Sequence, residues 1–354
     1  MLKELQNRME KENVELLIIN KLVNIRYLTG FTGSTANLVV SQEGGYILVD
    51  PRYWEQANKE VLEFQPVLVN EDLNFYSFCK ELVKKQRVKK IGFEGNHISY
   101  FEWIKLQDID SDIELVPTEN WVEEFRVVKN SDEISKIKKA LEIAEKAFEE
   151  ILEFIRPEVS EKDLAIELEY KMAKLGSEKP SFDTIIASGE RSALPHGKAT
   201  NKRIKKGEFI VFDFGAIYEG YCSDITRTVF VGTPNEEELL IYDIVLKAQK
   251  EAEEIIKEGL EGSFVDGVSR DIIQENGFGN YFGHGLGHGV GLEIHEFPPL
   301  SPKGNIILKE NMVVTIEPGI YLYGKFGVRI EDLVVVGKER STVLNSFTND
   351  LITI

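Results

Sequence analysis

Apolar and polar residues in the first 120 positions follow the spacing of helices and of strands in turn. Residues 2–12 place apolar side chains at helical spacing, whereas the apolar run at 14–20 predicts a buried strand. Two further apolar runs predict a hairpin over 36–50. The alternation continues with expected helices at 51–61, 73–86 and 99–108 and expected strands at 64–70, 89–95 and 114–118. Strands that alternate with helices predict an α/β unit.

The pattern changes near residues 123–131. Ser131 precedes two acidic residues, which is typical of a helix start, and a long helix is expected over 132–155. Ser160 is expected to cap a second helix that reaches Gly176. Beyond it we expect strands at 184–188, 208–216, 221–232 and within 311–336, and helices at 236–258 and 263–275. Helices and antiparallel hairpins in one unit predict an α+β domain.

Length and charge narrow the class of protein. The 354 residues suggest roughly two domains, which we place at 1–125 and 126–354. Lys and Arg number 42 against 60 Asp and Glu, a net charge of −18 that argues against a nucleic acid or an anionic membrane as partner. Two cysteines exclude a disulfide scaffold and fit a reducing compartment. Because no long apolar run occurs near the start, we expect no signal peptide and a cytoplasmic protein.

Acidic side chains stand in strongly apolar strands, where they are uncommon. Asp213 lies in VFDFG and Asp224 in YCSDITRTVFV. A turn at 219–220 would pair Asp213 with Thr226. Asp224 would then be a diagonal neighbour of Asp213 on the same face, about 7–8 Å away at Cα.

The same arrangement recurs near the end of the chain. Glu317 lies in VVTIEPG and Glu331 in FGVRIEDLVVV, and a loop centred on Gly324 would place the two glutamates opposite each other. Acids on the exposed face of a half-buried strand explain either pair alone equally well. The repetition favours a common site, where four carboxylates would repel one another unless cations neutralised them. Two divalent cations would balance four carboxylates.

Three of the five histidines fall within twelve residues. His284, His288 and His295 lie in GHGLGHGVGLEIHE, whose alternate glycines exclude a stable helix and therefore an HExxH zinc site. This clustering favours a functional role over three separate structural ones. His97 is expected to be structural or exposed, and His196 alone would suggest a loop or packing role. Phosphate-binding, GxSxG and CxxC motifs are absent.

Together these residues resemble the five metal ligands of the pita-bread metallopeptidases. That family includes methionine aminopeptidases, Xaa-Pro dipeptidases (prolidases), aminopeptidases P and creatinases. The matching residues are Asp213, Asp224, His288 in GHGLGHGVG, Glu317 in TIEPGIY and Glu331 in VRIED. Residues 24–34 and 124–134 resemble the creatinase-type N-terminal domain and its junction. The resemblance spans the whole chain and implies an α/β creatinase-type N-terminal domain followed by an α+β pita-bread catalytic domain.

The resemblance implies a role for each ligand. Asp213 would chelate one metal ion, Asp224 and Glu331 would bridge two ions, and His288 and Glu317 would bind the other. The family usually holds manganese, cobalt, zinc or iron. The mostly oxygen ligand set agrees with two Mn²⁺ or Co²⁺ ions foremost, with Zn²⁺ or Fe²⁺ as possibilities. A metal-bridging hydroxide would attack the scissile carbonyl.

Further residues acquire roles by the same resemblance. Glu317 is similar to a proton shuttle, and His196 and His295 would steady the substrate and the developing oxyanion. His284 would line the same pocket. Arg329 resembles a residue that supports the ligands, although the residue type alone is equally compatible with an outward-facing charge.

The N-terminal domain narrows the implied activity. Methionine aminopeptidases generally lack it, and creatinases lack the complete ligand set. Xaa-Pro peptidases remain, and their substrate has a tertiary nitrogen with no N–H to bind. The implied partner is a small peptide with proline at its second position, and the family implies a homodimer.

One departure leaves alternatives open. Many prolidases read roughly HEWPR where this chain reads HEFPP over 295–299, and the Arg is expected to hold the dipeptide's C-terminal carboxylate. Pro299 cannot form that ion pair, so aminopeptidase P-type cleavage of longer Xaa-Pro peptides is an alternative. A non-catalytic peptide-binding relative is another. A dinuclear metallophosphatase is disfavoured, because it would need more positive charge at its entrance.

Overall fold

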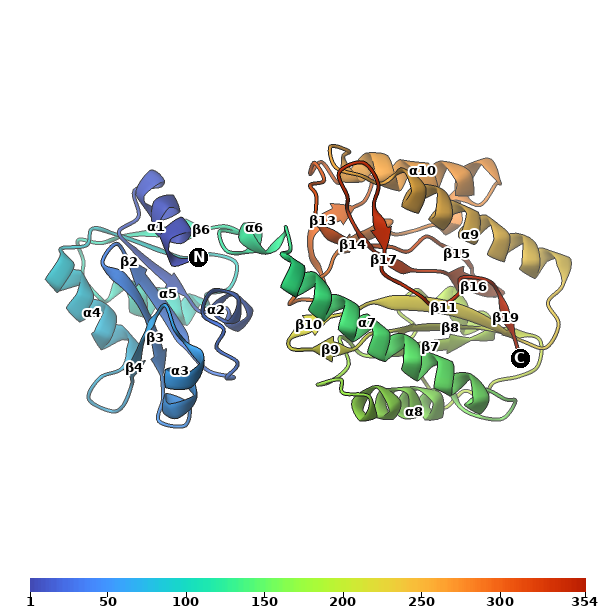
Figure 1. The fold of residues 1–354 in the computed structure, drawn as a ribbon, viewed down its shortest axis with the longest axis horizontal. Helices are drawn as coiled ribbons and strands as arrows, with labels where there is room; N and C mark the ends of the chain where they lie inside the picture. The colour runs from blue at the N-terminus through green and yellow to red at the C-terminus, as the bar shows by residue number, and fades with distance from the viewer. The chain divides into compact units, whose positions relative to one another are not determined.

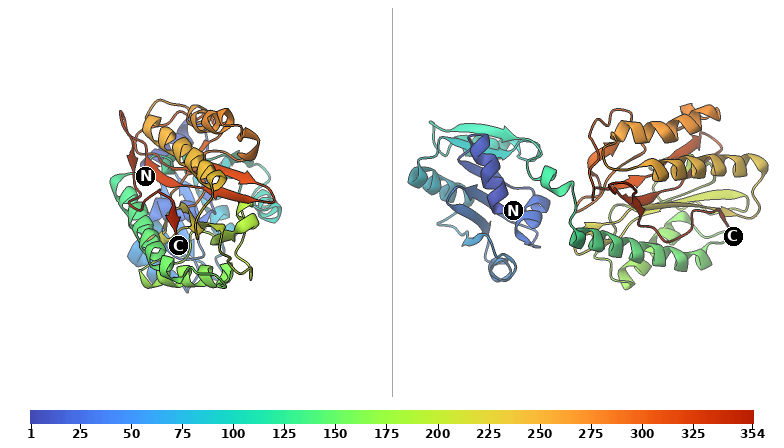
Figure 2. Two further views of the ribbon diagram at one scale, coloured as in Figure 1. Left: turned by 90° about the vertical axis from the view of Figure 1, so that its right-hand side faces the viewer. Right: turned by 45° about the horizontal axis from the view of Figure 1, so that its top comes forward.

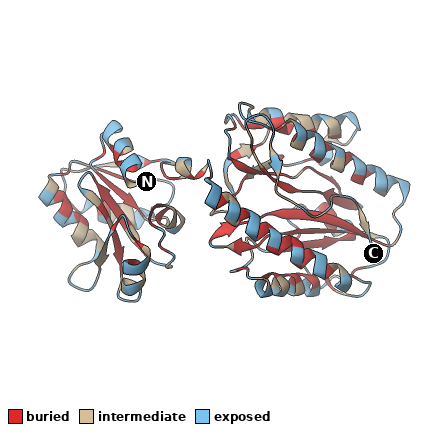
Figure 3. Cartoon of the chain, in the orientation of Figure 1, coloured by how far each residue is buried: buried red, intermediate tan, exposed pale blue.

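The computed structural model covers residues 1–354 and divides into two compact units, Met1–Arg126 and Val127–Ile354 (Figure 1). Each unit has apolar clusters of its own, and burial is concentrated in the strands and on one side of each helix (Figure 3). None of the helices combines the length and the apolar character that a membrane crossing requires.

The N-terminal unit is built on a six-stranded mixed sheet in the order β4-β3-β2-β1-β5-β6. Its strands are β1 (Leu16–Ile19), β2 (Asn37–Ser41), β3 (Gly44–Val49), β4 (Gln65–Leu68), β5 (Lys90–Glu94) and β6 (Glu114–Thr118). Its helices are α1 (Leu2–Lys11), α2 (Leu22–Thr29), α3 (Trp54–Glu60), α4 (Phe75–Gln86), α5 (Tyr100–Gln107) and α6 (Glu123–Arg126). Alternate side chains of β1 enter two apolar clusters, one shared with α1, α2 and α3 and the other with α4 and α5. Helices therefore cover both faces of the sheet.

Two expectations for this unit need correction. Helix α2 was not expected, because its two turns include buried polar Asn24, whose side-chain amide donates to Glu94 and Glu123. The helix expected over 51–61 begins only at Trp54, so Pro51 lies in the preceding turn and not at the first helical position. Both differences arise from tertiary contacts or turn geometry that the apolar spacing does not report.

The second unit packs several small sheets between two pairs of helices. Its helices are α7 (Ser131–Ile151), α8 (Glu161–Lys174), α9 (Glu236–Ile255) and α10 (Gly262–Glu275), with short 3₁₀ turns at Leu152–Phe154, Gly189–Ala193 and Gly279–Tyr281. Asn130 caps α7, with Glu133 completing a capping box, so Ser131 is the first helical residue rather than the cap. Ser160 caps α8 as expected. The pairs α7–α8 and α9–α10 lie on opposite sides of the strands in Figures 1 and 2.

The strands of this unit form a four-stranded sheet, β19-β11-β8-β7, a five-stranded sheet, β13-β12-β14-β17-β18, and two short ribbons. The first sheet and the β9–β10 ribbon contain β7 (Ile185–Ser188), β8 (Glu208–Phe214), β9 (Ile217–Tyr218), β10 (Tyr221–Cys222), β11 (Ile225–Val231) and β19 (Ile352–Thr353). The second sheet contains β12 (Gly287–Gly289), β13 (Glu296–Leu300), β14 (Val313–Ile316), β17 (Asp332–Val335) and β18 (Thr342–Val343), and β15 (Gly319–Leu322) pairs with β16 (Phe326–Arg329).

Both acidic hairpins have the register that the sequence indicates. In the first hairpin, Asp213 pairs with Thr226. In the second, the pairs Ile316–Asp332 and Gly319–Arg329 lie on either side of Glu317 and Glu331, so these two glutamates lie opposite each other in register. The strand expected at 221–232 is interrupted, however, and Asp224 lies in the break between β10 and β11. Beside the break, the Ser223 amide still donates to the Ala216 carbonyl of the same hairpin over 2.9 Å, whereas the Cys222 amide donates to the Gly291 carbonyl of another segment over 2.8 Å.

Candidate metal centre

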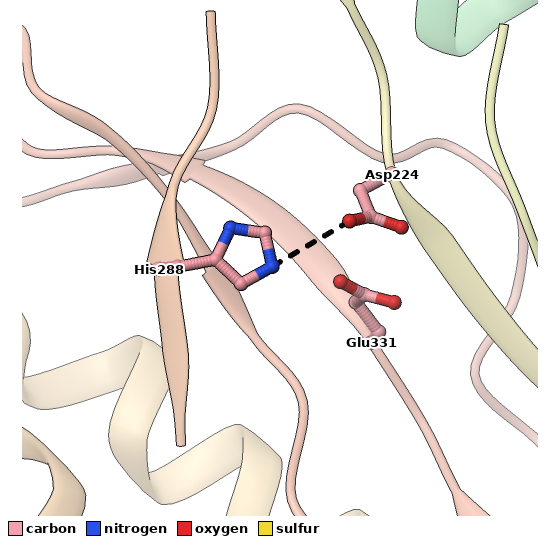
Figure 4. Close-up of side chains that lie close together, drawn as sticks. All are labelled: Asp224, His288 and Glu331. Carbon is pink, nitrogen blue, oxygen red and sulfur yellow. Dashed lines mark ion pairs between the residues drawn. The ribbon is translucent and has the colours of Figure 1, made fainter. Parts of the chain in front are cut away.

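Asp224, His288 and Glu331 converge from three separate parts of the chain (Figure 4). Asp224 precedes β11, His288 is the central residue of β12, and Glu331 lies between β16 and β17. One ligand-type atom from each lies within 4.8 Å of the others. Figure 4 shows both carboxylates facing the imidazole ring.

Two further carboxylates belong to this cluster. Glu317, in the break between β14 and β15, has Oε1 at 3.4 Å from His288 Nε2, and Asp224 Oδ2 lies 3.7 Å from the same nitrogen. Asp213 projects from β8 and accepts from the Arg329 guanidinium. The five residues expected to bind metal are thus linked through His288 and Arg329.

The tautomer of His288 suits a metal ligand. Its Nδ1 lies 3.0 Å from the Gly289 carbonyl, which can only accept, so Nδ1 carries the proton. Burial lowers the pKa of His288 and keeps the ring neutral. Nε2 therefore presents a lone pair toward Asp224 and Glu317. Lone pair and carboxylates repel one another unless a cation lies between them.

Unpartnered oxygens carry the strongest evidence that a cation fits. Asp224 Oδ1 and Glu331 Oε1 are buried and have no hydrogen-bond partner. A buried carboxylate that nothing compensates destabilises the folded protein by roughly several kcal/mol. Such groups normally bind metals or pair with other charges. Because the donors are four carboxylates and one imidazole, they fit divalent cations.

Burial dominates the electrostatics of these carboxylates. It raises the pKa of Asp213, an effect that the Arg329 guanidinium opposes, and raises the pKa of Glu317 to about 7. For Asp224 and Glu331, burial and then neighbouring carboxylates raise the pKa well above its ordinary value. A bound cation favours the charged form, so metal binding and loss of protons are coupled.

Arg329 points into the site. Its side chain is 3% exposed, which excludes an outward-facing charge. It donates to Asp213, to Thr226 Oγ1 at 3.1 Å, to Tyr321 Oη at 2.8 Å and to the Pro195 carbonyl at 3.1 Å. The guanidinium thereby fixes one carboxylate of the cluster and joins three segments around it.

Threonine hydroxyls orient two of the glutamates. Thr226 Oγ1 donates to Glu331 Oε2 over 2.7 Å, and Thr315 Oγ1 donates to Glu317 Oε1 over 3.1 Å. Thr315 Oγ1 also accepts from the His288 amide at 3.0 Å. Neither threonine was singled out from the sequence as a site residue, although pairing with Asp213 already placed Thr226 beside the site.

The other histidines lie around the same space. His295 packs edge-on against His288 with ring centroids 4.4 Å apart. His284 Nε2 accepts from Tyr321 Oη over 2.9 Å, and burial together with Arg329 lowers the pKa of His284 to about 4. His196 lines the cavity on an exposed segment, whereas His97 is an exposed residue of the N-terminal unit.

A cavity of about 540 Å³ opens over the carboxylates. Its wall is completed, beyond the residues already described, by Phe182, Asp183, Ile185, Pro195, Lys198, Ile294 and Ser301. The volume suits a ligand of a few residues.

Close backbone packing explains the glycine-rich segment. A Cβ on Gly287 would lie 2.0 Å from the Thr315 carbonyl oxygen, and one on Gly289 would lie 2.1 Å from the Phe297 carbonyl oxygen. Only glycine permits these approaches, which place His288 between β13 and β14.

A buried acid anchors the segment that carries His196. Glu161, at the start of α8, is completely buried and accepts from Ser188, Arg191 and Thr200. These donors lie on both sides of His196 in the chain, so one carboxylate fixes both ends of the segment. Glu161 has no sequence signal of its own, because acids are ordinary in the first turn of a helix.

A second anchor holds the glycine-rich segment from α10. Asp266 Oδ1 accepts from the Leu286 amide at 2.9 Å, and the buried Asp266 carboxylate pairs with the partly exposed Arg270. Arg270 in turn donates to the Phe282 carbonyl at 3.0 Å and the His284 carbonyl at 2.7 Å. Acid–base pairs one helical turn apart are common, so the spacing of Asp266 and Arg270 did not indicate that they hold the glycine-rich segment.

Comparisons with known proteins agree across both units. Residues 135–338 match the model for metallopeptidase family M24, and residues 1–128 match the creatinase/prolidase N-terminal domain. An Xaa-Pro dipeptidase of Pyrococcus furiosus is 41% identical over 356 residues, which cover 99% of each chain.

Solved structures give the same result. An Xaa-Pro dipeptidase from Bacillus anthracis is 41% identical with a TM-score of 0.97, covering 100% of this chain and 99% of that one. An X-Pro aminopeptidase from Thermotoga maritima is 40% identical with a TM-score of 0.92, covering 98% of this chain and 100% of that one. The similarity therefore extends over the whole length of each protein.

Proposed function

The chain belongs to metallopeptidase family M24, and from this premise we propose that it hydrolyses Xaa-Pro dipeptides with two divalent metal ions. The observation that carries the proposal is the pair of buried, unpartnered oxygens on Asp224 and Glu331 beside the bare Nε2 of His288. Relatives described as Xaa-Pro dipeptidases support the choice of substrate.

We assign the ligands as the family resemblance implies. Asp213 would hold one ion, His288 and Glu317 would hold the other, and Asp224 and Glu331 would serve both. The proposed ions are Mn²⁺ or Co²⁺, because most donors are carboxylate oxygens. When bound, two such ions acidify a water molecule and polarise the scissile carbonyl.

The chain's own residues manage the protons and the substrate. Glu317 takes the proton of the attacking water and delivers it to the proline nitrogen as that bond breaks. Thr315 fixes the orientation of the Glu317 carboxyl through its bond to Oε1. His196 and His295 donate to the substrate carbonyl and stabilise negative charge as it develops there.

The chemistry of the leaving group suits this arrangement. The nitrogen of an Xaa-Pro bond carries no hydrogen, so it cannot be recognised as a donor before cleavage. Once cleavage begins it needs a proton, which Glu317 supplies from within the cavity.

Cleavage of longer Xaa-Pro peptides is the second candidate. Pro299 has no cationic side chain to offer a substrate carboxylate and does not line the cavity. A relative from Thermotoga maritima is described as an X-Pro aminopeptidase. Both observations favour measuring dipeptides and tripeptides together.

The test uses protein stripped with EDTA and reloaded with Mn²⁺ or Co²⁺. The kcat/KM on Ala-Pro is compared with that on Ala-Pro-Ala, and the expected result is metal-dependent cleavage that favours the dipeptide. Preference for the tripeptide would support the aminopeptidase instead. Two bound ions without cleavage of either peptide would contradict both and favour a peptide-binding protein.

We further propose a homodimer in the cytoplasm. The family resemblance supports the dimer, and the low cysteine content, with both Cys79 and Cys222 free and buried, supports a reducing compartment. Sedimentation equilibrium at micromolar concentration would test the dimer directly, with a monomer mass of 40.3 kDa as the contrary result.

A further inference from the structure

The cavity has two permanently charged cations among its lining residues, Arg329 and Lys198. Arg329 is buried and occupied by Asp213, Tyr321 and the Pro195 carbonyl. The Lys198 side chain, in contrast, is 75% exposed. An incoming anion therefore has one cation that it can reach without displacing buried contacts.

The backbone of Lys198 is fixed even though its ammonium group is exposed. Arg191 donates to the Lys198 carbonyl over 2.6 Å, and Arg191 is itself held by Glu161. Lys198 also forms an antiparallel bridge with Ile185, which lines the same cavity. The side chain thus extends from a defined point on the wall, and its ammonium group is exposed.

The present partner of Lys198 is readily exchanged. Its Nζ lies 2.6 Å from Asp183 Oδ2, and the Asp183 side chain is 78% exposed. Such exposed pairs are weak because water screens both charges, so another carboxylate can replace Asp183 at little cost. Asp183 also lines the cavity, which places the exchange within reach of a bound ligand.

Resting on the proposed function, we propose that Lys198 binds the free C-terminal carboxylate of the substrate dipeptide in place of Asp183. Five carboxylates also line the cavity, those of Asp183, Asp213, Asp224, Glu317 and Glu331. With two divalent cations balancing the other four carboxylates, Asp183 remains to repel a dipeptide carboxylate at this part of the wall, and Lys198 beside it offers the opposite charge. Lys198 thereby makes the free carboxylate, and hence the dipeptide, the preferred substrate.

The test compares Ala-Pro with Ala-Pro-amide on the full chain loaded with Mn²⁺. The two substrates differ at the carboxylate alone, so only Ala-Pro can use the charge. Lys198→Gln should raise KM for Ala-Pro about tenfold, the size of one hydrogen bond to a charged group, and change KM for the amide less than about twofold. Lys198→Arg should restore most of the loss, and Asp183→Asn should lower KM for Ala-Pro.

Lys325→Gln is the matched control. Lys325 forms an exposed pair with Glu237 at 2.7 Å, with 57% and 51% of the two side chains exposed, and it does not line the cavity. This variant should match the unaltered enzyme on both substrates.

The outcomes separate this inference from the function on which it rests. If Lys198→Gln affects both substrates equally, or neither, the role of Lys198 is overturned while Xaa-Pro hydrolysis stands. If the unaltered enzyme with Mn²⁺ bound cleaves neither substrate, the proposed function fails, and this inference fails with it.

Discussion

At the scale of single residues, burial decides how the acids of the site behave. Desolvation is the largest cause of the raised pKa of Asp224, Glu317 and Glu331, and the carboxylates of the cluster reinforce it. Arg329 offsets part of the effect at Asp213. The charged forms of these carboxylates are therefore unfavourable without cations, and the cluster is suited to binding them.

Replacing Asp224 by Asn should remove metal and activity together. The amide keeps the size of the side chain but loses the negative charge that Asp224, as a proposed ligand of both ions, would supply. Metal content by plasma mass spectrometry should fall, and kcat/KM on Ala-Pro should decrease by about 1,000-fold. Full activity in this variant would reject the bridging assignment.

His196→Ala should separate metal binding from turnover. His196 lines the cavity as an exposed residue and is not one of the three clustered ligand-type residues. Metal content should therefore be unchanged, while kcat falls by about 100-fold through loss of oxyanion stabilisation. Loss of metal from this variant would place His196 among the ligands instead.

At the scale of elements, breaks in the strands locate the ligands. Glu317 and Glu331 stand where two strands of a hairpin are interrupted, and their amides bond other segments. The Glu331 amide donates to the Thr226 carbonyl over 3.1 Å, and the Glu317 amide donates to the Leu286 carbonyl over 2.8 Å. A register slip of one residue would turn both acids to the opposite face.

Glu161→Gln tests the anchor of the segment that carries His196. The neutral amide weakens the charge-assisted bonds from Ser188, Arg191 and Thr200. The free energy of unfolding should fall by about 2 kcal/mol, and kcat should fall at temperatures where the variant is fully folded. Combined with His196→Ala, the loss in kcat should be less than the product of the single losses.

Glu167 on the same helix provides the control, since its side chain is 32% exposed and its pair with Lys171 spans 3.7 Å. Glu167→Gln should change the unfolding free energy by less than about 0.5 kcal/mol. Independent losses of kcat in the double variant would show that Glu161 does not act through His196, and an unchanged kcat in Glu161→Gln would show that it acts on stability alone.

At the scale of the second unit, the carboxylates lie where two apolar cores meet. Asp213 and Asp224 adjoin Phe214 and Ile225 of the core that includes α7 and α8. Glu317 and Glu331 follow residues of the core that includes α9 and α10. Cations held between the two pairs would therefore join the two halves of the unit as well as support catalysis.

The metal-free protein should lose stability as pH rises. The folded pKa of Glu317 is about 7 against an ordinary 4.5, so the folded chain binds more protons than the unfolded chain between these values. The contribution of Glu317 to the free energy of unfolding is present below pH 4.5 and is lost as pH rises through 7. This loss amounts to at most about 3 kcal/mol. Urea denaturation at pH 5 to 8 measures the decline.

Two comparisons check this prediction. Mn²⁺-saturated protein should not show the decline, because bound cations stabilise the charged carboxylates. In the metal-free state, Glu317→Gln should remove the part of the pH-dependent decline in unfolding free energy that Glu317 causes. Identical pH profiles for metal-free protein, metal-loaded protein and the variant would contradict the assignment of Glu317 as the titrating group.

Much of the architecture could be read from the sequence because it depends on neighbouring residues. Apolar spacing reflects which side of a helix or strand is buried, and turn residues set hairpin register, as at Glu219 and Gly220 with φ of 46° and 81°. The two-domain family fold, creatinase-type followed by pita-bread, is confirmed by the matches to both family models.

Contacts between distant segments decided the rest. The sequence pattern could not predict that Arg329 donates to Asp213, 116 residues away. Nor could it predict that Glu161 accepts from residues at both ends of the segment around His196. It also could not show that Lys198 reaches the cavity wall. Local preference determines which elements form, but the position of a charge within a low-dielectric site depends on which distant groups pack around it, and that is fixed only by the tertiary structure.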